Sequence, residues 1–146
     1  MRSITYQVIV IGMLMLVFSC HKAARVEEVK DKELTLQVSV LKDKAPGDES
    51  LTCKARIIPA KELAANETTE QKRLLNYKMD SCFYIKEGNN KNYASMVQAI
   101  ANGVSGTYEY LLVFDPDQKV RTDSVDLIYQ DRYINHKLYN LRISQK

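Results

Sequence analysis

The sequence LTLQVSV, at residues 34–40, alternates apolar with polar side chains, and LTCKARI, at residues 51–57, does the same. This period of two is typical of a strand that buries one face and exposes the other. The turn-rich segment DKAPGDES separates the two stretches, and Pro59 is expected to end the second one. The pattern predicts a β-hairpin with one apolar face, which the remainder of the chain has to cover.

The segments downstream of this hairpin are short and mostly strand-like. Residues 60–73 are polar and favour a helical turn or a loop, and Tyr93–Asn102 has the apolar spacing of a helix. Asn92 can cap the start of that helix, and Gly103 can end it. Strand-like patterns occupy four further segments, at 74–86, 107–114, 120–129 and 138–143. We therefore expect a mainly β domain, an antiparallel β-sandwich of the immunoglobulin or transthyretin kind with one short helix.

Upstream of the hairpin the chain has a different character. Residues 21–32 (HKAARVEEVKDK) are charged and lack apolar periodicity, which predicts a tether. Before them, Arg2 is followed by an apolar run from Val8 to Phe18. The run is shorter than the roughly 20 residues of a membrane-spanning helix. A basic residue, a short apolar run and a small residue, in that order, are typical of a secretion signal.

The run ends in Val17-Phe18-Ser19-Cys20, which resembles the lipobox of bacterial lipoproteins. That family has an aliphatic residue at −3, a small residue at −1 and a cysteine at +1. The resemblance implies a signal peptide at 1–19, a diacylglycerol on the Cys20 sulfur and a new amine that is open to acylation. Two or three acyl chains anchor a protein lastingly. The alternatives are an uncleaved membrane anchor and an ordinary cleaved signal.

On this interpretation, residues 20–32 are the lipidated cysteine with its tether, and residues 33–146 are the β-sandwich domain. In lipoprotein families, the residues after the anchoring cysteine act as sorting signals that determine the membrane to which the protein is sent. Here no aspartate follows Cys20 directly, and no acidic cluster of the kind that directs Bacteroidota lipoproteins to the cell surface lies close to it. The expected location is therefore the outer membrane, lipid-anchored and facing the periplasm.

Two cysteines remain in the domain, Cys53 and Cys82. In an oxidising compartment such a pair can form a disulfide, and both also lie in alternating apolar patterns that suit buried thiols. The sequence leaves these two alternatives open. Neither cysteine has a CxxC partner or a neighbouring histidine, so a catalytic thiol is not expected.

Several tyrosines in the strand-like segments are candidates for a partner surface. Their rings can form an aromatic platform for a sugar or for a partner chain. The alternative is that they are ordinary strand residues, because tyrosine favours strands. The residues concerned are Tyr108, Tyr110, Tyr129, Tyr133 and Tyr139.

Two smaller signals lie around the turn after residue 114. Asp123-Ser124-Val125 resembles the O-glycosylation site of Bacteroidota envelope proteins, which makes Ser124 a candidate for modification. Carboxylates also recur there, but only Asp115 and Asp117 share one tight loop, which is too few for a calcium site. We expect a solvated turn and no metal.

Charge and motifs limit the classes of function. The 21 basic and 18 acidic residues are mixed along the chain, so no basic block favours nucleic acid. The sequence contains no motif for nucleophilic, phosphate-binding or metal-based catalysis, and we expect neither enzymatic activity, a small-molecule substrate nor a cofactor.

Two hypotheses for the function remain. The first is an assembly or docking component of a larger outer-membrane or periplasmic complex, with other envelope proteins as partners. In size and layout the chain resembles the small outer-membrane lipoproteins of secretion or conjugation machines, including the type VI system. The second hypothesis is a surface module that binds a glycan or a host protein.

Overall fold

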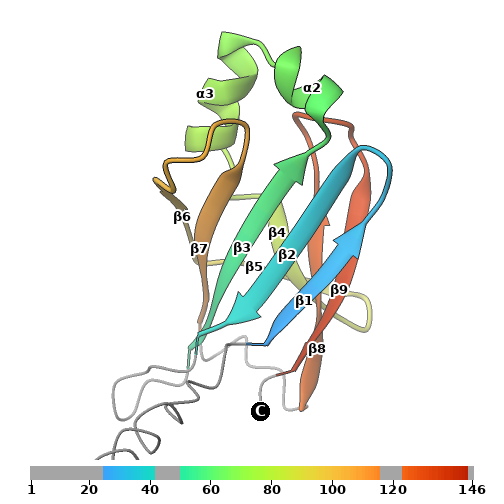
Figure 1. Ribbon diagram of the computed structural model, residues 1–146. Helices are drawn as coiled ribbons and strands as arrows, with labels where there is room; N and C mark the ends of the chain where they lie inside the picture. The colour runs from blue at the N-terminus through green and yellow to red at the C-terminus, as the bar shows by residue number, and fades with distance from the viewer. Residues whose placement is uncertain (1–24, 42–49, 116–122, 145–146) are drawn as a thin grey trace, which may run out of the picture.

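The computed structural model of the protein describes residues 25–41, 50–115 and 123–144 (Figure 1). These residues form nine strands in two antiparallel sheets, together with two short helices. The first sheet has the order β1-β2-β3-β7-β6, and the second has the order β5-β4-β8-β9. The elements are β1 (Val26–Lys30), β2 (Leu34–Val40), β3 (Leu51–Pro59), α2 (Lys61–Ala65), α3 (Thr69–Tyr77), β4 (Phe83–Glu87), β5 (Asn90–Tyr93), β6 (Met96–Ile100), β7 (Tyr108–Phe114), β8 (Ser124–Gln130) and β9 (Leu138–Ser144).

The predicted hairpin is confirmed and forms the centre of the first sheet. β2 pairs antiparallel with β3, with Leu36 opposite Ile57 and Val38 opposite Ala55. All four side chains are buried. The turn that the sequence predicts between the two strands lies mostly outside the described residues.

The strand order is that of an immunoglobulin sandwich. The chain places β2 and β3 in the first sheet, β4 and β5 in the second, β6 and β7 in the first, and β8 and β9 in the second. This gives one sheet ordered β2-β3-β7-β6 against another ordered β5-β4-β8-β9, as in immunoglobulin domains that have an extra edge strand in the second sheet. β1 is an addition that extends the first sheet beyond β2. The prediction of a mainly β antiparallel sandwich is confirmed.

The two sheets enclose one core that is rich in aromatic rings. Phe83 lies at its centre, with ring centroids 4.9 Å from Tyr129 and 5.7 Å from Tyr110. Tyr129 in turn stacks on Tyr139 at 6.0 Å. Stacked and tilted arrangements of this kind stabilise aromatic pairs beyond the area that they bury.

The predicted helix at 93–102 is wrong, because this segment contributes to two strands. β5 ends at Tyr93, and β6 begins at Met96. Between them the chain passes from one sheet to the other: the Ala94 amide donates to Phe83 in the second sheet, and the Ser95 amide donates to Val113 in the first. The pairing of β6 with β7 thus overrides a local helical spacing.

Helices occur earlier in the chain, within the segment predicted as a helical turn or a loop. α3 starts with a capping box, in which the Thr68 side chain accepts from the Gln71 amide while the Gln71 side chain accepts from the Thr68 amide. The helix continues to Tyr77. The strand predicted at 74–86 is therefore wrong in its first part, and only its end belongs to β4.

The predicted tether is also wrong over part of its length. Residues Val26–Lys30 form β1, which pairs antiparallel with β2. None of its side chains is fully buried, although Val29 packs against the core. An edge strand is held in the sheet by backbone hydrogen bonds and commonly carries charged side chains. It therefore shows no alternation of apolar and polar residues. The domain therefore includes residues from 26 onward and does not begin at residue 33.

Candidate functional site

Most of the tyrosines that are candidates for a partner surface lie inside the protein. The exposed fractions of Tyr110, Tyr129 and Tyr139 are 0%, 0% and 4%. Tyr108 and Tyr133 are only partly buried. An aromatic platform built from all five side chains is therefore wrong, because three of them are core residues.

The hydroxyl groups of these tyrosines bind partners within the domain. Tyr110 donates to the Leu75 carbonyl at 2.8 Å, which fixes α3 against β7. Tyr133 donates to the Lys78 carbonyl at 2.8 Å, and Tyr129 donates to the buried Asp131 at 2.6 Å. A buried tyrosine normally satisfies its hydroxyl in this way. These residues position the elements around the site and do not form a contact surface themselves.

The two cysteines are buried and are not joined to each other in a disulfide. Cys53 lies on β3 in the first sheet, whereas Cys82 directly precedes β4 in the second. Burial raises the pKa of the Cys82 thiol to about 11. A buried thiol of that pKa is a poor nucleophile at neutral pH.

Among the four sheet edges in the described part of the chain, one differs from the others in charge. β1 carries Glu27 and Glu28, β5 carries Lys91, and β9 carries Arg142. β6 has the sequence MVQAI and carries no charge. Charged side chains protect an edge from pairing with other chains, so β6 is the unprotected edge.

The uncharged stretch continues beyond β6 on both sides. No Asp, Glu, Lys, Arg or His occurs between Asn92 and Tyr108. The strand itself is largely exposed, with only Val97 partly buried. This edge therefore presents open backbone and apolar side chains together.

A groove runs along this edge, between β6 and α3. It consists of two adjoining cavities of about 430 and 440 Å³, which share Asn76, Ala99 and Tyr110 in their walls. We call them the polar cavity and the edge cavity, and together the β6 groove. The polar cavity is lined further by Glu67, Lys72, Asn102 and Tyr108, and the edge cavity by Tyr77, Met79, Asp80, Met96, Val97 and Gln98.

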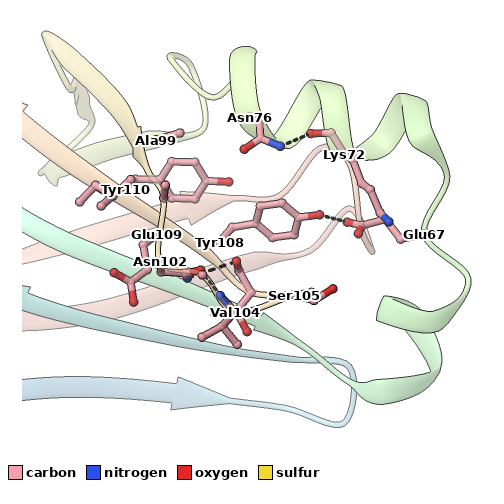
Figure 2. A pocket seen from close by; sticks show the side chains of 15 residues that line it. Glu67, Lys72, Asn76, Ala99, Asn102, Val104, Ser105, Tyr108, Glu109 and Tyr110 are labelled. Carbon is pink, nitrogen blue, oxygen red and sulfur yellow. Dashed lines mark hydrogen bonds between the residues drawn. The ribbon is translucent and has the colours of Figure 1, made fainter.

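Hydrogen bonds order the wall of the polar cavity (Figure 2). The Tyr108 hydroxyl points toward Glu67 and donates to its carboxylate. Burial, together with this hydrogen bond, raises the pKa of Tyr108, so its hydroxyl remains protonated at neutral pH. Asn76 donates to the Lys72 carbonyl at 2.7 Å, and Asn102 accepts from the Val104 amide at 2.9 Å. The cavity thus presents amide, hydroxyl and carboxylate groups in fixed positions.

Exposed apolar side chains gather at the same groove. Of the seven large hydrophobic residues that are exposed in the described part of the chain, four line it. The exposed fractions are 74% for Tyr77, 40% for Met96, 38% for Ile100 and 59% for Val104. Single exposed apolar residues are ordinary, but a cluster beside an open strand marks a binding surface.

A buried ion pair supports β7 next to this edge. Glu109 is 4% exposed, accepts from Arg56 Nε at 2.6 Å and pairs with Lys54 at 2.8 Å. Burial acts to raise the pKa of Glu109, but the hydrogen bonds from Lys54 and Arg56 outweigh burial and lower it. The carboxylate therefore stays ionised and links β7 to β3.

Ser124 starts β8, is partly buried, and accepts a hydrogen bond from Arg142 at 3.1 Å. Within the described ranges, no three or more metal-ligating side chains form a cluster, and Asp117 lies outside those ranges. The lipobox and Cys20 also lie outside them.

None of the helices in the described part of the chain has the length and apolar character needed to cross a membrane. Comparisons with protein-family models, with curated proteins and with solved structures found no match to this chain.

Proposed function

We propose that this chain is a lipid-anchored, non-enzymatic protein of the bacterial envelope that serves as a docking component of a larger outer-membrane or periplasmic complex. Cys20 carries the anchor, and the β6 groove receives the partner. The observation that carries this proposal is the uncharged, exposed edge of β6 beside a groove lined with apolar side chains. The other three edges of the sandwich carry charge. An edge left open in this way is suited to binding.

The position of the groove within the domain also supports docking. Figure 1 shows α2 and α3 together at one end of the sandwich, while β1 starts at the opposite end. A lipid on Cys20 places the start of β1 near the membrane. The polar cavity and α3 then face away from the membrane, where a partner in the periplasm can reach them.

The anchor is tested by Cys20→Ala. We expect this variant, with residues 1–19 replaced by an ordinary cleavable secretion signal, to leave the membrane fraction and to appear as a folded, soluble protein in the periplasm, because it has lost the acyl chains. Fractionation with and without carbonate washing measures the change, and circular dichroism of the purified variant checks the fold. Persistent membrane association of Cys20→Ala would contradict a lipid anchor.

Docking is tested by placing a charge on the open edge. We expect Gln98→Lys to lose the envelope proteins that co-purify with the wild-type chain after crosslinking in cells, because a lysine blocks strand pairing at an edge. The matched control is Asn140→Lys, which makes the same kind of change at an exposed position of β9. Equal recovery of the same proteins with both variants would contradict docking at β6.

A second candidate function rests on the polar cavity. Its fixed amide, hydroxyl and carboxylate groups beside Tyr108 suit a ligand that is rich in hydroxyl groups, such as a glycan. A glycan-binding module is useful on the cell surface, whereas an assembly component faces the periplasm. Protease added to intact cells distinguishes the two: digestion favours the glycan module, and protection until the outer membrane is opened favours docking.

A further inference from the structure

We infer that the occupant of the β6 groove is an extended segment of a different protein, which adds to β6 as a further strand and has uncharged, apolar side chains at alternate positions. This inference rests on the docking role proposed above and names the kind of partner. Three features of the groove lead to it: the free side of β6, the two faces that its side chains present, and the place of the anchor.

The first feature is the backbone of β6. The strand pairs with β7 on one side, and within the described ranges no strand lies on its other side. Its outward N–H and C=O groups are therefore available to a further strand. Main-chain hydrogen bonds of this type supply the affinity in strand addition, and side-chain pockets supply the specificity.

The second feature is the set of side chains that an added strand would meet. Val97 and Ala99 lie opposite the buried Leu112 and Tyr110, so they share the inner face of the sheet. Alternate side chains of an added strand would enter the edge cavity on this face. There they would lie beside Val97, which favours an aliphatic side chain, while Asp80, also in the wall of this cavity, is exposed to water.

The other side chains of the added strand would lie on the outer face. Met96 and Ile100 are exposed on that face, opposite Val113 and Glu109 of β7. No residue of β6 offers a charge to pair with. A charged side chain that the added strand places on this outer face would lose hydration without gaining a charged partner on β6. The outer face of β6 therefore favours uncharged side chains.

The third feature argues against a second copy of this chain as the occupant. A symmetric dimer through one edge requires the two β6 strands to pair antiparallel, which turns the second copy end for end. The start of its β1 would then lie at the far end of the sandwich. Cys20 lies six residues before Val26, a reach of about 20 Å at most. The nine-residue β3 alone is about 30 Å long. With the start of β1 near the membrane and α3 away from it, as the docking role places them, both copies could therefore not be anchored in one membrane.

The inference is tested by measuring the binding of peptides to residues 20–146 with the substitution Cys20→Ala. A phage library that displays random segments of about nine residues, long enough to hold a typical strand of about five or six, is panned on this protein, and the recovered consensus is synthesised. We expect apolar residues at alternate positions and no charge in the centre. Hydrogen exchange should show that the bound peptide protects amides of residues 96–100. Gln98→Lys should weaken binding about tenfold or more, whereas Asn140→Lys leaves it unchanged within about twofold.

Other results would overturn the inference. A peptide that protects no amide in β6, or that binds Gln98→Lys as well as wild type, would show that strand addition does not occur there. A concentration-dependent dimer that Gln98→Lys dissociates would make a second copy the occupant. If no peptide binds while Gln98→Lys still loses its partners in cells, the docking function stands and the partner uses a folded surface. If the peptide binds as expected while Gln98→Lys keeps its partners in cells, the docking function is wrong.

Discussion

Replacing Asp131 with alanine is expected to lower the free energy of unfolding by about 3 kcal/mol or more, because hydrogen bonds to a buried charge are strong and their loss leaves polar groups unsatisfied. Asp131 is 3% exposed and lies in the connection between β8 and β9. Its carboxylate accepts from the Tyr129 hydroxyl and from four consecutive backbone amides, those of Tyr133, Ile134, Asn135 and His136.

The same carboxylate holds a left-handed residue in place. His136 has a φ of 60°, which is uncommon for a residue with a side chain. Urea unfolding followed by tyrosine fluorescence or circular dichroism measures the change. Asp115→Ala, at an exposed position, serves as the control and should change stability by less than about 0.5 kcal/mol. A loss of less than about 1 kcal/mol for Asp131→Ala would contradict the role of Asp131 in ordering this loop.

Replacing Tyr110 with alanine is expected to lower the free energy of unfolding by about 3–5 kcal/mol, the usual cost of removing a buried aromatic ring. The ring is fully buried and contacts Phe83, and its hydroxyl holds α3 through the Leu75 carbonyl. Tyr110→Phe keeps the ring and should cost only about 1 kcal/mol, the value of one hydrogen bond.

The control for this experiment is a tyrosine on the same groove that is not buried. Tyr77 is 74% exposed at the end of α3, and Tyr77→Ala should leave stability nearly unchanged. Thermal and urea unfolding of the four proteins on the Cys20→Ala background give the comparison. If Tyr110→Ala were as stable as Tyr77→Ala, Tyr110 would be a surface residue, and its place in the core would be wrong.

The architecture of the sandwich could be predicted because its central strands bury one face. The alternation at 34–40 and 51–57 corresponds to side chains that are mostly buried and partly buried in turn on β2 and β3. Edge strands carry no such signal. The sequence of β1 is charged and was predicted to be a tether, and the sequence of β6 is uncharged and was predicted to be a helix. Neither edge strand has to bury every second side chain, so neither shows the alternation of a strand.

The facing of the tyrosines could have been predicted better. Tyr139, Leu141 and Ile143 occupy every second position of one strand, and Tyr110, Leu112 and Phe114 do so in another. Each of the two tyrosines therefore shares a face of its strand with large apolar residues. That position in the pattern indicates a core residue, and the structure places all six in the core. Tyrosine content alone says nothing of exposure.

The β6 groove could not be predicted, because it depends on which elements meet in space. Its two walls come from α3 and from β6, about twenty residues apart in the sequence. The Thr68–Gln71 capping box was a local signal for α3. The uncharged run from Asn92 to Tyr108 was the signal for the groove, since so long a run is unusual in a chain with 27% charged residues.

The most direct measurement of docking at β6 is photo-crosslinking in living cells, with a photoreactive phenylalanine derivative at position 98 of the full chain. The same probe at position 140, on the charged edge, is the control. Docking at β6 predicts one discrete adduct with another envelope protein from position 98, and none from position 140. Adducts of equal yield from both positions, or an adduct from position 140 alone, would contradict it.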